Sequence, residues 1–169
     1  MQLERLVPAL SPVNVVNAAP VEIADLAYDT RGVIPGALFF CVRGSRSDGH
    51  ELAAEAVARG ATALVVEHEL ALSVPQVVVE STRRAMAPAA VAYFDHPSSE
   101  LDVAAVTGTA GKTTTTYLLY EILRAAGRRP GLLTNMERRV GDETRAASLN
   151  TPEAIDLQRL FREMVDART

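Results

Sequence analysis

A glycine-rich turn between an apolar run and an amphipathic helix constrains this chain more than any other feature. Residues 106–114 spell Val-Thr-Gly-Thr-Ala-Gly-Lys-Thr-Thr. The run Leu101–Val106 predicts a short strand, and the leucine spacing after the turn predicts a helix from Lys112 to about Ala126. A strand, a tight loop and a helix N-terminus direct backbone N–H groups and the helix dipole toward one point. The sequence therefore predicts a phosphate-binding loop.

The residue types in this loop fit the chemistry of a nucleoside triphosphate. Gly108 and Gly111 allow a sharp turn and a close approach of the backbone to phosphate oxygens. We expect Lys112 to act as the catalytic cation on the β- and γ-phosphates of ATP, and the Thr113 hydroxyl to bind Mg²⁺. The full set of expected ATP contacts is Gly108, Thr109, Ala110, Gly111, Lys112, Thr113 and Thr114.

The basic residues of the chain support this interpretation. Of the 17 basic residues, Lys112 is the single lysine, and it lies inside the glycine-rich loop. A compact ammonium suits a point charge on a phosphate, whereas arginine offers a planar fork. Val106 departs from the general pattern, which has a glycine at that position. The alternative is therefore a glycine-rich turn that carries an ordinary lysine.

Charge and hydropathy narrow the class of protein. The formal net charge is −4 and no basic stripe is visible, which argues against a nucleic-acid partner. No apolar stretch is long enough to predict a membrane span, and no signal pattern opens the chain, so we expect a cytoplasmic protein. The one cysteine, Cys41, lies in an apolar run and is expected to be a buried structural thiol.

The first part of the chain, residues 1–98, predicts a small α/β domain. Helical spacing over His50–Arg59 predicts one helix, and Ser81-Thr82 opens an alanine-rich helix that extends to about Phe94. The turn-forming residues 95–99 indicate a linker, so we place a domain boundary near residue 98. Three apolar, β-branched runs predict buried strands: Ala37–Val42, Ala61–Glu67 and Val74–Glu80.

The second part, residues 99–169, predicts the start of a further α/β domain. Pro130–Thr134 is expected to be a strand that completes a βαβ unit, and residues 138–149 to form a hairpin around Gly141-Asp142. Thr151 as N-cap and Pro152 at the first helical position open a last helix. A parallel sheet with two or three strands leaves its central strands uncovered, so this sheet is expected to be incomplete and the chain to be part of a longer protein.

Several segments resemble the Mur ligase family. The loop Gly-Thr-x-Gly-Lys-Thr-Thr is similar to the nucleotide loop of that family. The stretch Asp29-Thr30-Arg31 with Val33–Phe39, and Asp48-Gly49-His50 with Gly60-Ala61, resemble the opening of its substrate domains. The segment 148–153, Ser-Leu-Asn-Thr-Pro-Glu, is similar to its MurE branch.

The resemblance implies an ATP-dependent ligase of peptidoglycan precursor synthesis. Such an enzyme adds a diamino acid to UDP-N-acetylmuramoyl-L-alanyl-D-glutamate through an acyl phosphate. Residues 1–98 would bind the UDP-sugar, residues 99–169 would begin the ATP-binding domain, and the absent C-terminal domain of the full-length protein would bind the diamino acid. Substrate contacts implied by the resemblance are Asp29, Thr30, Arg31, Asn150 and Thr151.

Two departures from the family pattern keep alternatives open. Ala110 stands where the family usually has Asn, and Asn150 where the MurE branch usually has Thr. Both favour a non-catalytic paralogue that binds a UDP-sugar and ATP. Asp29-Thr30 is also a good turn or cap pair, and Thr151 is explained by capping alone. An unrelated P-loop NTPase would need an apolar strand ending in Asp after residue 134, and the sequence has none.

Overall fold

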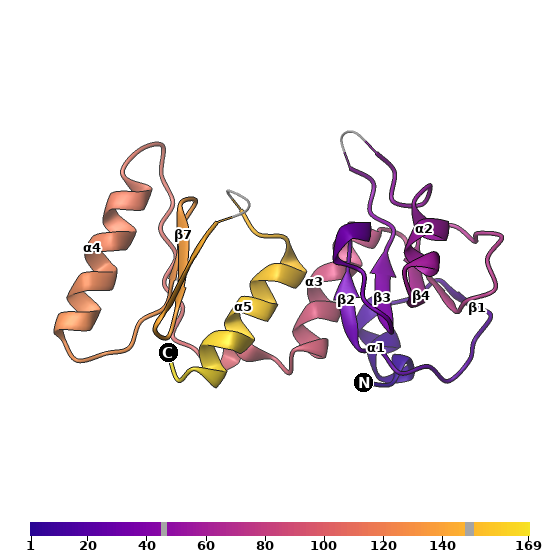
Figure 1. Cartoon of the computed structure of the whole chain (residues 1–169), viewed down its shortest axis with the longest axis horizontal. Helices are drawn as coiled ribbons and strands as arrows, with labels where there is room; N and C mark the ends of the chain where they lie inside the picture. Colours follow the sequence, from indigo (N-terminus) through magenta and orange to yellow (C-terminus); the bar gives the residue numbers. More distant parts are fainter. Residues whose placement is uncertain (45–46, 148–150) are drawn as a thin grey trace. The chain divides into compact units, whose positions relative to one another are not determined.

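The chain folds into two compact units, each a mixture of helices and strands (Figure 1). The structure, a computed structural model, describes residues 1–44, 47–147 and 151–169. The first unit is Met1–Tyr93 and the second is Phe94–Thr169. The expected α/β class is confirmed. No helix within the described ranges is both long and apolar enough to cross a bilayer.

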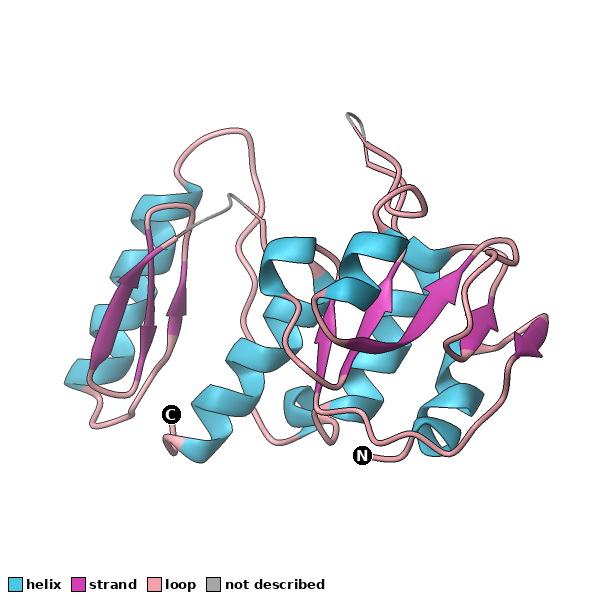
Figure 2. Cartoon of the chain, turned by 45° about the vertical axis from the view of Figure 1, so that its right-hand side comes forward, coloured by secondary structure: helices cyan, strands magenta, loops and turns pink. Residues whose placement is uncertain are grey.

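A five-stranded sheet forms the centre of the first unit (Figure 2). Its order is β1-β5-β4-β3-β2, with β2 to β5 mutually parallel and β1 antiparallel to β5. The strands are β1 (Asn14–Val16), β2 (Asp25–Ala27), β3 (Ala37–Phe40), β4 (Ala61–Val66) and β5 (Gln76–Val78). The three strands expected from apolar runs are thus confirmed as β3, β4 and β5, each shorter than its run.

Both faces of this sheet are buried. Phe39 of β3 and Leu64 of β4 pack in one core cluster with Ala53 and Ala56 of α2 (Ala53–Ala58). Because strand side chains alternate between faces, Leu38 lies on the opposite face, to which α3 (Thr82–Tyr93) and α1 (Leu3–Leu10) belong. All four residues of β3 are buried. A strand buried on both faces explains why β3 appears in the sequence as a continuous apolar run.

The second unit contains a three-stranded antiparallel sheet flanked by two helices. Its elements are η2 (Pro97–Ser99), α4 (Lys112–Ala125), β6 (Leu132–Leu133), β7 (Glu137–Val140), β8 (Glu143–Ala146) and α5 (Ala154–Asp166). The strand order is β6-β7-β8. Gly141 has φ +55° in the two-residue turn between β7 and β8, so the expected hairpin is confirmed over the described residues. Leu160 and Met164 of α5 pack against Val140 of β7.

Three expectations for the second unit are wrong. Residues 101–106 form no strand, because no described segment offers them a hydrogen-bonded ladder partner. The βαβ unit is absent from the described residues, since β6 pairs with β7 in the antiparallel sense. The last helix begins at Ala154 with Glu153 as N-cap, not with Thr151, and no side chain caps it.

The unpaired segment borders a hollow of about 890 Å³ within the second unit. Residues 101–106 line it together with Leu119 and Leu123 of α4 and Phe161 of α5. On α4, Leu118 and Ile122 are more than half exposed, and among the described residues of this helix only Tyr120 is buried. The apolar surface of this unit is therefore largely open.

Candidate functional site

The glycine-rich loop ends at the N-terminus of α4, as its residue types require. Gly111 has φ +78° and Gly108 has φ +154°, a backbone that residues with a Cβ rarely adopt. A Cβ built on Gly111 would meet open space, so its backbone conformation, not crowding, demands glycine there. No side chain caps α4, and its first internal bond runs from the Thr115 N–H to the Gly111 carbonyl. The preceding N–H groups of the first turn are therefore positioned to receive an anion.

Two side chains of the first helical turn contact the loop and the segment that follows β6. The Lys112 ammonium donates to the Gly108 carbonyl at 2.5 Å, so the lysine folds back over its own loop. The Thr113 hydroxyl donates to the Asn135 amide oxygen at 3.2 Å. Thr109, Ala110 and Thr114 are exposed beside them. Sequence analysis did not single out Asn135, and no local signal marks it, because its place beside Thr113 depends on the path of the chain after β6.

The Asp29–Arg31 segment directly follows β2, at the carboxyl end of a parallel strand. Asp29 caps η1 (Thr30–Gly32) by accepting from the Arg31 N–H at 2.9 Å. The Arg31 guanidinium also donates to both Asp29 oxygens, and its Nη2 lies 2.5 Å from Oδ2. These hydrogen bonds hold the pKa of Asp29 below its ordinary value. Thr30 is buried, so the three residues of this motif have different environments.

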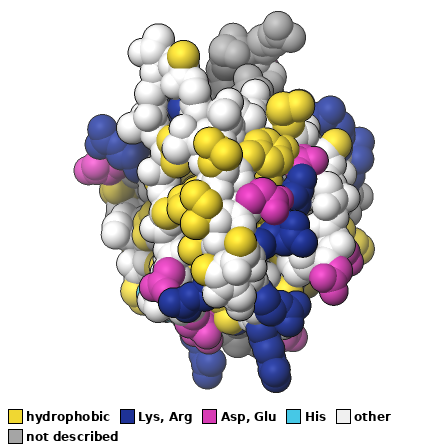
Figure 3. All heavy atoms as spheres, turned by 90° about the vertical axis from the view of Figure 1, so that its left-hand side faces the viewer, with side chains coloured by type: hydrophobic (Ala, Val, Ile, Leu, Met, Phe, Trp, Pro, Cys, Tyr) yellow, Lys and Arg dark blue, Asp and Glu magenta, His cyan; other side chains and the backbone are white. Residues whose placement is uncertain are grey.

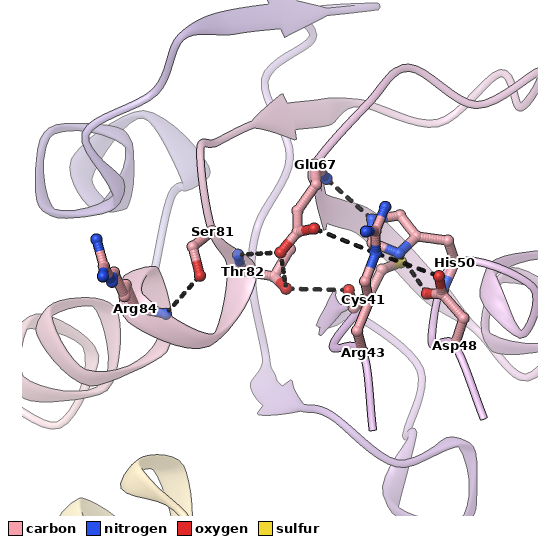
Figure 4. Close-up of polar contacts among 8 residues, drawn as sticks. All are labelled: Cys41, Arg43, Asp48, His50, Glu67, Ser81, Thr82 and Arg84. Atoms are coloured by element: carbon pink, nitrogen blue, oxygen red, sulfur yellow. Dashed lines mark hydrogen bonds and ion pairs between the residues drawn. The ribbon is translucent and has the colours of Figure 1, made fainter. Parts of the chain in front are cut away.

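A polar network joins the carboxyl ends of β3 and β4 to the start of α3 (Figure 4). Asp48 accepts from the His50 N–H at 2.9 Å and contacts the His50 Nδ1 at 2.6 Å. The His50 Nε2 in turn accepts from the Glu67 N–H at 2.9 Å. The backbone N–H of His50 is the main cause that lowers the pKa of Asp48.

The same network continues through charged and hydroxyl groups. Arg43 Nε lies 3.3 Å from both Asp48 Oδ2 and Glu67 Oε2. Glu67 Oε1 accepts from the Thr82 N–H at 3.1 Å, which supplies α3 with an N-terminal cap from a distant strand. The Thr82 hydroxyl lies 3.1 Å from the Cys41 carbonyl oxygen, which accepts from it. Sequence analysis quoted Asp48 and His50 in a motif but gave them no role, and it overlooked Arg43 and Glu67 because their meeting depends on sheet order.

The other expected substrate contacts are Asn150 and Thr151, which precede α5 in the sequence. Asn150 lies outside the described residues, and Thr151 is exposed ahead of α5. The loop at residues 108–114 belongs to the second unit, whereas residues 29–31 belong to the first. Within the described ranges no group of three or more His, Cys, Asp or Glu side chains is arranged to hold a metal. The oxygen-bearing side chains beside the loop include the Thr113 hydroxyl and the Asn135 amide, which are of the kind that Mg²⁺ accepts.

Comparison with known proteins defines the class. The family model described as "Mur ligase family, catalytic domain" matches residues 22–99, and that of the "Mur ligase middle domain" matches residues 106–169. The two models together cover both units, and the chain belongs to the Mur ligase family.

Two curated relatives of this chain share one name. A UDP-N-acetylmuramoyl-L-alanyl-D-glutamate--2,6-diaminopimelate ligase of Geobacillus thermodenitrificans is 44% identical over 98% of this chain and 34% of the relative. The ligase of the same name from Geobacillus kaustophilus is 47% identical over 86% of this chain and 30% of the relative. The chain therefore spans about a third of the length of these relatives.

Solved structures share the fold. MurF from Acinetobacter baumannii aligns with a TM-score of 0.66 at 23% identity, over 95% of this chain and 32% of that one. A structure of a UDP-N-acetylmuramoyl-L-alanyl-D-glutamate--2,6-diaminopimelate ligase aligns with a TM-score of 0.66 at 19% identity, over 93% of this chain and 32% of that one.

Proposed function

We propose that this chain supplies the UDP-sugar-binding and ATP-binding parts of a ligase that adds a diamino acid to UDP-N-acetylmuramoyl-L-alanyl-D-glutamate. The observation that carries the proposal is the 44% identity that extends over 98% of the chain to a ligase of that name. The name of that relative also supports 2,6-diaminopimelate as the incoming amino acid. ATP and nucleotide sugars are cytoplasmic metabolites, so we propose the cytoplasm as the compartment.

The reaction proceeds in two steps. The terminal carboxylate of the UDP-sugar peptide attacks the γ-phosphorus of ATP, which releases ADP and leaves an acyl phosphate. The amine of the diamino acid then attacks the acyl carbon, loses a proton and displaces inorganic phosphate, so that an amide bond forms. Phosphoryl transfer depends mainly on alignment and on neutralising charge. The second unit would provide both through its loop.

Lys112, Thr113 and the N–H groups that begin α4 have positions that suit roles in ATP binding. The N–H groups at the start of α4 would donate to the phosphates, and Lys112 would exchange the Gly108 carbonyl for a phosphate oxygen. The Thr113 hydroxyl, now bonded to Asn135, is an oxygen ligand of the kind that Mg²⁺ accepts. Mg²⁺ would neutralise charge on the β- and γ-phosphates when bound. In the first unit, Thr30 would contact the uridine, and Asp29 and Arg31 would stabilise the turn that contains it. In the second unit, Thr151 and Asn150 would contact the substrate.

A non-catalytic role is the second candidate, and two departures from the family pattern favour it, Ala110 and Asn150. Ala110 places a methyl group in the loop where the family usually has an amide. A paralogue of this kind would bind the UDP-sugar without using ATP. Its UDP-sugar affinity would be indifferent both to the Lys112→Ala substitution and to ATP.

Calorimetric titration tests the proposal. The chain is titrated with UDP-N-acetylmuramoyl-L-alanyl-D-glutamate, alone and with a non-hydrolysable ATP analogue and Mg²⁺. We expect saturable binding of both ligands and no amide product from the chain alone. Failure of a folded chain to bind the UDP-sugar would overturn the proposal, whereas UDP-sugar binding without ATP-analogue binding would favour the paralogue.

A further inference from the structure

We infer that His50 is a positioning residue for the UDP-sugar site of the first unit, acting through Asp48 and Glu67 on the loop that follows β3. This inference rests on the proposed function, since it concerns how that ligand is held. Neither the family models nor the relatives assign a role to these three residues.

The hydrogen bonds define the protonation state of His50. Nε2 accepts from the Glu67 N–H, so this nitrogen carries no proton. Nδ1 then carries the proton and donates to Asp48 at 2.6 Å. The side chain of His50 is 4% exposed, so neither bond is easily replaced by water. A neutral imidazole therefore ties the loop residue Asp48 to the backbone at the carboxyl end of β4.

The base of the loop is closed by further contacts. Arg43 and Asp48 form an antiparallel bridge, and the Gly44 N–H donates to the Ser47 carbonyl at 2.9 Å. A Cβ on Gly49 would lie 2.6 Å from the Val42 nitrogen, so only glycine lets the loop return so close to β3. These contacts fix the two ends of the loop, residues 43–44 and 47–49, in one arrangement.

The place of the network in the fold connects it with ligand binding. In sheets of parallel strands, ligands bind outside the carboxyl ends of the strands. The network lies at the ends of β3 and β4, and Asp29–Arg31 lies at the end of the neighbouring β2. The side chains of Asp48 and Glu67 are only 32% and 20% exposed. Their partial burial has a desolvation free-energy cost that the carboxylates of an ordinary surface loop avoid. Fixing residues 47–50 at the carboxyl edge of the sheet gives a reason for that cost.

The first unit also offers a matched control at the other end of the same sheet. Gln76 opens β5, at the amino edge of the parallel strands, and is 0% exposed. Its amide accepts from the Leu70 N–H at 2.9 Å and donates to the carbonyls of Leu70 and Leu72. Gln76 therefore resembles His50 in burial and bonding but lies away from the carboxyl edge.

The test compares His50→Ala with Gln76→Ala in the whole chain. We expect His50→Ala to weaken UDP-N-acetylmuramoyl-L-alanyl-D-glutamate binding by about ten- to a hundredfold, because a misplaced loop loses its contacts. Gln76→Ala should lower the thermal midpoint but leave that affinity within about twofold of the unsubstituted chain, since it lies outside the proposed site. Affinity for the ATP analogue in the second unit should stay unchanged in both variants.

Two isosteric variants cover the case in which His50→Ala does not fold. His50→Asn retains a donor toward Asp48 and loses the acceptor for Glu67, whereas His50→Gln retains that acceptor and loses the donor. Each should weaken UDP-sugar binding severalfold. Unchanged affinity in the folded His50 variants, or an equal loss in Gln76→Ala, would overturn the positioning role. Absence of UDP-sugar binding by the unsubstituted chain would remove the proposed function itself, and this inference with it.

Discussion

The two units of this chain differ in how completely their apolar surfaces are covered. In the first, four parallel strands are covered on both faces, and the polar groups at their carboxyl ends are bonded to one another. In the second, the helix that carries the glycine-rich loop leaves Leu118 and Ile122 more than half exposed. Figure 3 shows hydrophobic side chains among charged ones on the face of the molecule that includes α4. The loop and its helix therefore form from local signals, although the described residues do not form the parallel sheet expected behind them.

The largest expected difference between the units is thiol reactivity. Burial raises the pKa of Cys41 from its ordinary value of 9.0 to about 12, which lowers the thiolate fraction about a thousandfold. We expect alkylation of native Cys41 at pH 8 to be at least about a thousandfold slower than in urea.

A cysteine placed on the second unit is the control for that measurement. In a Cys41→Ala background, Leu118→Cys should react at the rate of a free thiol, since Leu118 is 60% exposed. Rapid labelling of native Cys41 would show that the core of the first unit opens readily, and the contrast between the units would fail.

The next effect concerns packing, tested by the same substitution in both units. Leu64→Ala removes a side chain that is 0% exposed and should lower the free energy of unfolding by roughly 2–5 kcal/mol. Leu118→Ala should change it by less than about 0.5 kcal/mol, because this side chain already faces water. Urea unfolding followed by circular dichroism measures both. Similar costs at the two sites would mean that α4 is covered in solution.

A smaller effect is expected at the loop. Lys112→Ala should weaken binding of the ATP analogue about ten- to a hundredfold, the worth of one or two hydrogen bonds from a charged donor. Lys112→Arg should not restore it, because a planar guanidinium does not replace a compact ammonium at a phosphate.

UDP-sugar affinity serves as the control in the same titrations. It should be equal in both Lys112 variants and in the unsubstituted chain, because that site is proposed for the first unit. ATP-analogue binding that ignores both substitutions would contradict the proposed contact between Lys112 and the phosphates.

The smallest effect depends on pH. The pKa of Asp48 in the folded chain lies below its ordinary value of 3.8, so its charged form is favoured by folding. The decrease in the free energy of unfolding caused by Asp48→Asn should therefore be largest at neutral pH. It should disappear as the pH falls below 3.8 and through the lowered pKa. Glu51→Gln, at an exposed neighbouring position, should show no such pH dependence. A constant difference down to acid pH would contradict the contribution of the Asp48 charge.

Elements with strong local signals were predicted well. The apolar runs behind β3, β4 and β5, the helices α3 and α4, and the hairpin at Gly141 were all visible, because each signal lies within a few residues. The helix α1 was missed although Leu3, Leu6 and Leu10 have helical spacing and are buried, so a usable signal was overlooked. The strands β1 and β2 have three residues each and exist only through pairing with β5 and β3.

The sequence by itself determined the glycine-rich loop, the helix that follows it and the family resemblance, because these depend on residue type and close spacing. Only the tertiary structure decided that residues 101–106 pair with no described strand, since a strand needs a partner that its own sequence cannot supply. It also decided that Asp48, His50 and Glu67 form one network, because a hydrogen bond between residues 17 positions apart depends on strand order. The types and spacing of neighbouring residues determine the local chemistry, whereas contacts between distant residues depend on how the chain folds.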